Sequence, residues 1–193
     1  AMNDGNNGNN YNITTQTATG SIAKKDLTIT AVTANKTYDG TTAATGSPTY
    51  NATDVQTGDT LTVTQAYDDK NAGTGKTITA DYAMNDGNSG NNYNITTQIA
   101  TGDIAKKELT LAVTAANKAY DGTTAATVTG YGLTGLVGAE TVVASSNGAT
   151  FSDKNAADSK PVTINGISLI DGTNGGLASN YTVASNAAAT ADI

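Results

Sequence analysis

Two glycine-rich loops carry the side chains in this sequence that are best suited to bind a metal ion. They read Asp4-Gly-Asn-Asn-Gly-Asn-Asn10 and Asp86-Gly-Asn-Ser-Gly-Asn-Asn92, so carboxylate or amide oxygens recur at alternate positions. Hard cations prefer such oxygen ligands, but an EF-hand also needs a bidentate glutamate, which neither loop has. Each loop is therefore either a solvated hairpin turn or a calcium site, with the candidate ligands Asp86, Asn88, Asn91, Asp4 and Asn6.

The side chains most often used for acid–base and nucleophilic catalysis are missing. The sequence has no His and no Cys, and its ten basic residues are all Lys. General bases and activated nucleophiles at neutral pH are commonly His and Cys. Adjacent carboxylates do occur, at Asp68 and Asp69, but aspartate is also a common turn residue. We predict that the protein is not an enzyme, has no catalytic residues and, calcium apart, uses no cofactor.

The tripeptide Tyr-Asp-Gly occurs twice and predicts a structural turn rather than a ligand contact. An aspartate side chain can accept hydrogen bonds from the backbone of a turn, and glycine tolerates positive φ. The tyrosine ring would then cover a sheet edge while its hydroxyl finds a partner. The residues expected to form these turns are Tyr38, Asp39, Gly40, Tyr120, Asp121 and Gly122.

The sequence repeats itself with an offset of 82 residues. Residues 1–28 return at 83–110 with four differences, and the stretch around Tyr-Asp-Gly returns at the same offset. Such a period is too long for one turn of a solenoid and fits a small domain. We predict repeat 1 at 23–104 and repeat 2 at 105–193, preceded at 1–22 by the tail strand of another repeat.

Both repeats show the two-residue periodicity of half-buried strands. Apolar residues alternate with Thr in runs such as Leu27–Ala31 and Leu61–Thr64, and Gly-rich turns separate the runs. No segment has apolar residues at helical spacing. About seven short strands per repeat predict an all-β fold, two tandem antiparallel β-sandwich domains of immunoglobulin-like type. A β-grasp-like fold is the alternative and would require a helix.

The connection between the repeats predicts an elongated array. Ile104-Ala-Lys-Lys-Glu-Leu-Thr110 contains no Gly, Pro or Ser spacer. A joint without such a spacer should be stiffer than a flexible linker. Each repeat is therefore expected to have the neighbouring repeats of the same chain as its direct partners.

Composition narrows the remaining classes of partner. The net charge of −7 disfavours nucleic acid and anionic membrane surfaces, which both bind basic patches. No stretch is apolar enough to insert into a membrane. Aromatic residues make up 5% of the chain and Trp is absent, so each core must be thin and mainly aliphatic.

Several motifs resemble the YDG repeat of bacterial surface proteins. They are Lys36–Ala44 and Lys118–Ala126 around Tyr-Asp-Gly, the stretch Asp69–Ile78, and the Asn-Tyr pairs at Asn92 and Asn180. Repeat 2 departs from the pattern at Ala156–Ser159, where Gly-x-Gly is lost. This repeat and the allied MBG repeats occur in large secreted adhesins of the filamentous-haemagglutinin kind. The resemblance implies a stalk and no enzymatic activity.

Together with the tandem repeats, this resemblance implies an extracellular protein at the bacterial cell surface. The repeats would be the structural stalk or spacer of an adhesin, which projects a binding region for cell–cell, host or biofilm-matrix attachment. Extracellular polysaccharide or a host surface would then be contacted through other regions. In the alternative, the repeats themselves are weak carbohydrate-binding modules that gain avidity through repetition.

Overall fold

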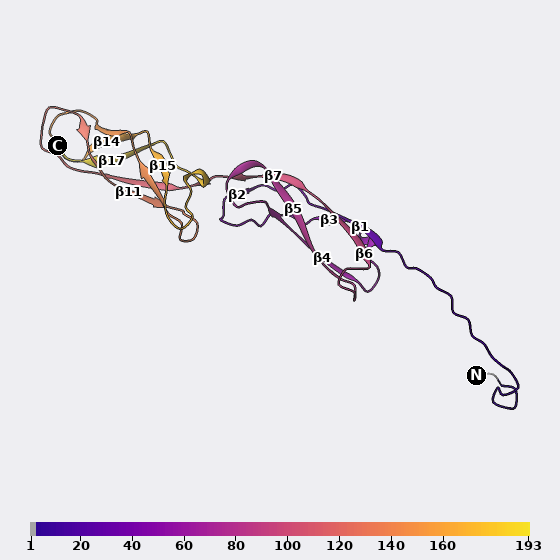
Figure 1. Ribbon diagram of the computed structural model, residues 1–193. Coiled ribbons are helices and arrows are strands. Elements are labelled where there is room, and N and C mark those ends of the chain that lie inside the picture. The colour runs from indigo at the N-terminus through magenta and orange to yellow at the C-terminus, as the bar shows by residue number, and fades with distance from the viewer. Residues whose placement is uncertain (1–2) are drawn as a thin grey trace.

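The computed structural model describes residues 3–193, which form an elongated all-β molecule with its ends far apart (Figure 1). The predicted all-β fold of sandwich type is thus confirmed. The helical segments in this range are two three-residue 3₁₀ turns, η1 (Ala52–Asp54) and η2 (Ala178–Asn180). The β-grasp alternative, which needs a true helix, is therefore wrong. No helix in residues 3–193 is long and apolar enough to cross a bilayer.

Repeat 1 is a sandwich-type pair of sheets. The strand order is β3-β1-β6 in the first sheet and β2-β7-β5-β4 in the second. Apolar residues from both sheets are buried together, including Leu27, Ile29, Ile78 and Ile104, each at most 2% exposed. The strands are β1 (Lys25–Thr30), β2 (Lys36–Thr37), β3 (Thr49–Tyr50), β4 (Thr60–Tyr67), β5 (Gly73–Asn85), β6 (Tyr93–Gln98) and β7 (Ala100–Ala105).

Parallel strand pairs distinguish this repeat from the antiparallel sandwich that the sequence predicts. β1 pairs in parallel with β6, from Lys25 opposite Tyr93 to Thr30 opposite Gln98, and β2 pairs in parallel with β7. The reason lies in the path of the chain. β6 and β7 form one extended segment that leaves the first sheet at Ile99 and enters the second, and β1 and β2 cross beside it in the same direction.

Repeat 2 has the same kind of strands in a more divided arrangement. Its largest sheet has the order β10-β13-β14-β17, and three further pairs are β9·β11, β12·β15 and the parallel pair β8·β16. In β14 every second side chain is buried, as the alternation of Val162 and Ile164 with polar residues predicts. The strands are β8 (Lys107–Glu108), β9 (Thr110–Ala115), β10 (Ala125–Ala126), β11 (Val128–Thr134), β12 (Val142–Ser145), β13 (Gly148–Phe151), β14 (Lys160–Asn165), β15 (Ser168–Asp171), β16 (Tyr181–Thr182) and β17 (Asn186–Ala191).

The hydrophobic core does not stop at the boundary between the repeats. One cluster of buried side chains contains the core of repeat 1 together with Leu109, Val142 and Tyr181 of repeat 2. A second cluster, around Phe151, Val162 and Ile164, lies entirely within repeat 2. A single residue, Lys106, separates β7 from β8. The near end of repeat 2 is therefore packed onto repeat 1.

The segment that precedes β1 forms no strand in its described part, residues 3–24. Its sequence is nearly that of β6 and β7, which in repeat 1 pair with β1 and β5. The tail has no such partner strands, so the strand expected there does not form and Tyr11, Ile13 and Ile22 are exposed. Residues 1 and 2 of the predicted tail lie outside the described range.

Glycine at position 102 is a requirement of the close packing between crossing segments. A Cβ atom built on Gly102, in β7, would lie 1.7 Å from the backbone oxygen of Ala34. The matching glycine of the tail, Gly20, has nothing within 4 Å. We expect Gly102→Ala to lower the free energy of unfolding by about 1–3 kcal/mol, the usual cost of overpacking. Urea denaturation measures the change.

Gly20→Ala is the matched control, because the two glycines share the local sequence Ala-Thr-Gly. It should leave the free energy of unfolding within about 0.5 kcal/mol of the parent value, as for other surface changes. Equal effects of the two substitutions would contradict the packing described for β7.

Candidate functional site

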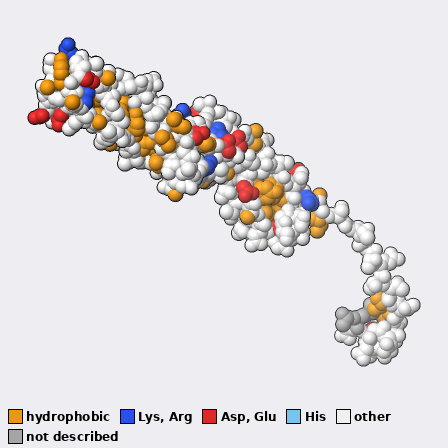
Figure 2. Space-filling view, turned by 60° about the vertical axis from the view of Figure 1, so that its left-hand side comes forward, with side chains coloured by type: hydrophobic (Ala, Val, Ile, Leu, Met, Phe, Trp, Pro, Cys, Tyr) orange, Lys and Arg blue, Asp and Glu red, His pale blue; other side chains and the backbone are white. Residues whose placement is uncertain are grey.

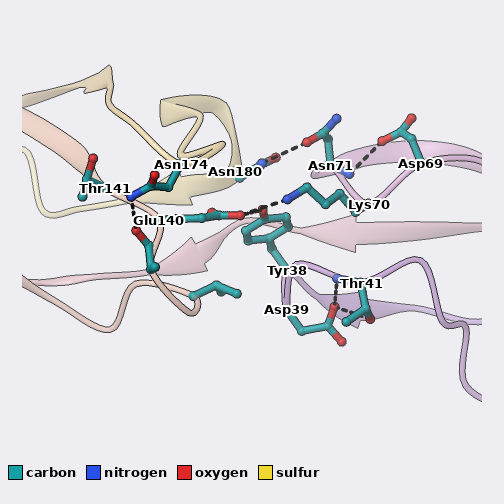
Figure 3. A network of polar contacts seen from close by, with 12 residues as sticks. Tyr38, Asp39, Thr41, Asp69, Lys70, Asn71, Glu140, Thr141, Asn174 and Asn180 are labelled. Carbon is teal, nitrogen blue, oxygen red and sulfur yellow. Dashed lines mark hydrogen bonds and ion pairs between the residues drawn. The ribbon is translucent and has the colours of Figure 1, made fainter.

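The most elaborate polar site in the described chain lies at the joint between the repeats (Figure 3). Its centre is Glu140, which precedes β12 and closes a turn in which its backbone N–H donates to the carbonyl of Val137 at 3.0 Å. The turn aims the side chain at repeat 1, and only 7% of that side chain is exposed. A buried carboxylate is costly unless donors surround it.

Both repeats supply donors to the Glu140 carboxylate. Tyr38 of repeat 1 donates its hydroxyl to Oε1 at 2.7 Å, and Lys70 Nζ of repeat 1 lies 3.0 Å from the same oxygen. Tyr181 of repeat 2 donates its hydroxyl to Oε2 at 2.7 Å. The carboxylate thus receives three charge-assisted hydrogen bonds, a class stronger than neutral hydrogen bonds. Two of the three come from the other repeat.

An amide pair forms a second contact across the joint. Asn180 is fully buried; its Oδ1 accepts from the backbone N–H of Ala72 at 2.9 Å, and its Nδ2 donates to Oδ1 of Asn71 at 3.0 Å. These bonds fix the side chain of Asn180 in one orientation. In the part of the chain that the structure describes, every buried side-chain nitrogen and oxygen has a hydrogen-bond partner.

Apolar contacts complete the joint. The rings of Tyr38 and Tyr181 meet edge to face with their centroids 5.4 Å apart, a favourable geometry for aromatic pairs. Gly40 has φ +79° and lies so near the other repeat that a Cβ atom there would be 2.8 Å from Cγ1 of Val137. The glycine of the first Tyr-Asp-Gly motif therefore serves both the turn and the approach of repeat 2.

The charges at the joint shift the acidity of its members. Burial alone would raise the pKa of Glu140, but hydrogen bonds from Tyr181, Tyr38 and Lys70 outweigh it and hold that pKa below its ordinary value. Burial and the hydrogen bond to Glu140 raise the pKa of Tyr181 to about 12, and the same causes raise the pKa of Tyr38. The joint thus holds an ionised carboxylate between neutral phenols.

Both Tyr-Asp-Gly turns are held by the lysine two residues before the tyrosine. In repeat 1, Asp39 accepts from the backbone N–H of Thr41 at 2.9 Å and from Lys36 Nζ at 2.8 Å. In repeat 2, Asp121 accepts from the backbone N–H of Thr123 at 2.9 Å and from Lys118 Nζ at 2.8 Å. The bond from Lys118 and those from Thr123 lower the pKa of Asp121 to about 2.

The tyrosines of the two motifs have different surroundings. Tyr38 is 1% exposed within the joint, whereas Tyr120 is 60% exposed at the far end of repeat 2. Gly40 and Gly122 share the left-handed conformation, with φ +79° and +77°. The same local turn thus presents its tyrosine at the same kind of place in each repeat. Within the described residues, Tyr38 is covered by the other repeat and Tyr120 is exposed.

The glycine-rich loops at Asp4 and Asp86 use their carboxylates to close the loop. Asp86 accepts backbone N–H groups from Asn88 and Gly90 at 2.8 Å and from Asn92 at 3.1 Å, and Asp4 has the same three contacts in its own loop. Within residues 3–193, no three acidic side chains lie close enough to hold a metal ion. The other calcium candidates also make hydrogen bonds inside these loops. Asn6 donates to Asn10, Asn88 donates to Asn92, and Asn91 donates to the backbone oxygen of Asn88.

Sequence analysis singles out Tyr38 as part of a turn, but it predicts neither the place of Tyr38 in the joint nor its acceptor. Glu140 is one of two glutamates in the chain and stands outside every motif that repeats. Lys70, Asn71 and Asn180 do lie in motifs, yet nothing in the sequence tells that their side chains reach the next repeat. The sequence offers one signal for Glu140: glutamate is rare in this chain, and this glutamate lies next to a glycine turn.

Removal of the Tyr38 hydroxyl tests the joint directly. Tyr38→Phe leaves the ring in place and takes one donor from buried Glu140, so we expect a loss of about 1–3 kcal/mol in the free energy of unfolding. Tyr120→Phe is the matched control in the other motif and should change it by less than about 0.5 kcal/mol. Chemical denaturation of both variants gives the comparison; equal losses would contradict the assignment.

The joint should weaken in acid. A carboxylate whose pKa is lowered in the folded state contributes stability above its unfolded pKa, taken as 4.5 for glutamate, and loses it as the pH falls through the folded value. We expect the difference in unfolding free energy between the parent and Glu140→Gln to be constant near pH 7 and to shrink below pH 4.5. A difference that does not depend on pH would count against an ionised Glu140.

Comparison with known proteins agrees with the repeat structure of the chain. A model of the YDG domain matches residues 23–101 and 105–190, and these stretches begin where the predicted repeats begin. No curated protein and no solved structure matches the chain. Because the two matches cover most of the sequence, the chain belongs to the YDG domain family, of which it contains two tandem members.

Proposed function

We propose that the two repeats are a rigid spacer, a segment of the stalk of a secreted bacterial surface adhesin of the filamentous-haemagglutinin kind. The stalk would project a binding region toward another cell, a host surface or the biofilm matrix. The observation that carries the proposal is the joint at Glu140, where repeat 1 supplies two of the three donors to one buried carboxylate.

A spacer must keep its length under thermal motion, and several features of the joint favour this. The core continues from repeat 1 into Leu109, Val142 and Tyr181. Only Lys106 separates the last strand of one repeat from the first strand of the next. Bending the joint would open buried polar groups to partial solvation, a cost of about 1–3 kcal/mol for each bond lost.

The surface supports a spacer more than a carbohydrate-binding role. Sugar sites commonly offer an exposed aromatic platform. The exposed tyrosines Tyr11, Tyr82 and Tyr120 lie on the tail, on β5 and at the far end of repeat 2, so these three rings do not form one platform. Figure 2 shows hydrophobic side chains in several separate groups along the molecule. Weak carbohydrate binding by the repeats is accordingly the second proposal.

Spin labels on the two repeats test the rigid spacer. The chain has no native Cys, and Thr79 and Thr163 are exposed strand residues in repeats 1 and 2. In the Thr79→Cys/Thr163→Cys protein, double electron–electron resonance should give one narrow distance distribution. Adding Glu140→Ala should broaden it, because both tyrosines and Lys70 lose their acceptor.

A broad distribution in the protein with Glu140 intact would contradict the spacer. A glycan array of the same protein separates the second proposal from the first. The spacer has no specific glycan ligand, whereas a binding module would give reproducible hits that disappear when one exposed tyrosine is replaced by alanine.

A further inference from the structure

The two ends of the molecule repeat the two halves of the central joint. We call the face that presents Glu140 and Tyr181 in repeat 2 an acid face, and the face that presents Tyr38, Lys70 and Asn71 in repeat 1 a lysine face. The joint is a lysine face docked onto an acid face. The structure contains a second copy of each face, one at each end.

The acid face of repeat 2 has a specific geometry. A turn joins Val137 to Glu140 through a hydrogen bond of 3.0 Å between the backbone N–H of Glu140 and the carbonyl of Val137. The hydroxyl of Tyr181 donates to the Glu140 carboxylate and accepts from the backbone N–H of Val137 at 3.1 Å. Tyr181 therefore links the turn at Val137 to the Glu140 carboxylate.

Repeat 1 has the same arrangement at its outer end. The backbone N–H of Asp59 donates to the carbonyl of Gln56 at 3.0 Å, across the same number of residues. The hydroxyl of Tyr93 donates to the Asp59 carboxylate and accepts from the backbone N–H of Gln56 at 2.9 Å. Asp59 and Tyr93 thus form an acid face at the end of repeat 1 that points away from repeat 2. Asn92, the counterpart of Asn180, is bonded to Asp86 instead.

Hydrogen bonds to Asp69 hold the loop that carries the lysine face of repeat 1. Asp69 accepts from the backbone N–H of Asn71 at 2.7 Å and from Lys76 Nζ at 2.6 Å. These bonds shape the loop that carries Lys70 and Asn71 to the joint.

The corresponding loop at the outer end of repeat 2 is held by the same kind of hydrogen bonds. Asp153 accepts from the backbone N–H of Asn155 at 2.7 Å and from Lys160 Nζ at 2.6 Å. The loop therefore presents Lys154 and Asn155 as the first loop presents Lys70 and Asn71. Tyr120, on the second Tyr-Asp-Gly turn, is 60% exposed, and a hydrogen bond of 2.8 Å from the backbone N–H of Phe151 to the carbonyl of Thr124 joins the segment after this turn to the strand before the loop. Tyr120, Lys154 and Asn155 form a lysine face, and all three are exposed among residues 3–193.

We propose that the lysine face of repeat 2 docks onto the acid face of repeat 1 in a second copy of this chain, head to tail. The hydroxyl of Tyr120 and the ammonium of Lys154 would bind the carboxylate of Asp59. Charge is complementary, and a tyrosine hydroxyl and a lysine ammonium already bind a carboxylate, that of Glu140, in the central joint. Such a contact uses two different surfaces, so it extends into strings rather than closing as a dimer. This contact between chains goes beyond the proposed spacer function, which needs only the joint inside one chain.

The contact between separate chains is weaker than the joint inside one chain. Association loses translational and rotational freedom, which the covalent connection through Lys106 removes in advance. A short connection corresponds to an effective concentration in the millimolar range. The test is therefore carried out at about 1 mM protein, where chains meet as often as linked faces do.

Zero-length cross-linking with a carbodiimide tests the proposal and contains its own control. The reagent joins a lysine amine to a carboxylate that is in contact with that amine, and water is lost as the amide forms. We expect the amide Lys70–Glu140 within each chain, where the atoms are 3.0 Å apart. In an equal mixture of ¹⁴N-labelled and ¹⁵N-labelled protein, we expect the amide Lys154–Asp59 between chains of different isotope.

Two variants sharpen the test. Lys154→Ala should abolish the link to Asp59 and the rise of the sedimentation coefficient with concentration. Lys106→Ala removes the same charge from an exposed site between the repeats and should preserve both. The proposal is overturned if Lys70–Glu140 forms while no mixed-isotope link joins Lys154 to Asp59, or if sedimentation does not depend on concentration.

Discussion

The arrangement of the two repeats depends on one buried carboxylate. Glu140 belongs to repeat 2, but Tyr38 and Lys70 of repeat 1 supply two of its three donors. A half-satisfied buried acid would be unfavourable, so neither repeat can keep this group buried without the other. The core residues Leu109 and Val142 extend the contact with apolar area. Polar bonds fix the relative orientation of the repeats, and apolar packing adds attraction that does not depend on direction.

This interaction gives the Tyr-Asp-Gly motif two separate tasks. Lysine, aspartate and glycine build the turn, and they do so alike in both repeats, through Lys36 with Asp39 and through Lys118 with Asp121. The tyrosine does not hold the turn. It is presented by the turn to whatever lies at that end of the repeat, which explains why one sequence motif contains both a 1% exposed and a 60% exposed ring.

Much of the fold follows from the sequence, since alternation of Thr with apolar residues predicts strands and the 82-residue offset predicts tandem units. The parallel pairing of β1 with β6 does not follow, because periodicity specifies a face and not a neighbour. The tail shows the same limit: Tyr11 and Tyr93 share a local sequence, yet only Tyr93 has a partner strand and is buried. Of the joint, the sequence indicates Tyr38 only as part of a turn and does not indicate Glu140, because a contact across a boundary has no local signature.

The path of the chain also determines how the molecule responds to tension applied at its two ends. Tension enters repeat 1 at the start of β1 and leaves at the end of β7, and β1 lies in parallel against β6 over six residue pairs. A pull draws β1 one way and the β6–β7 segment the other, along the strand direction. The hydrogen bonds between them are then loaded in shear and must yield together, instead of opening one after another as in a zipper. The hydrogen bonds that resist the force therefore lie along β1 and β6, and the series ends with the bond from the backbone N–H of Ala31 to the carbonyl of Gln98.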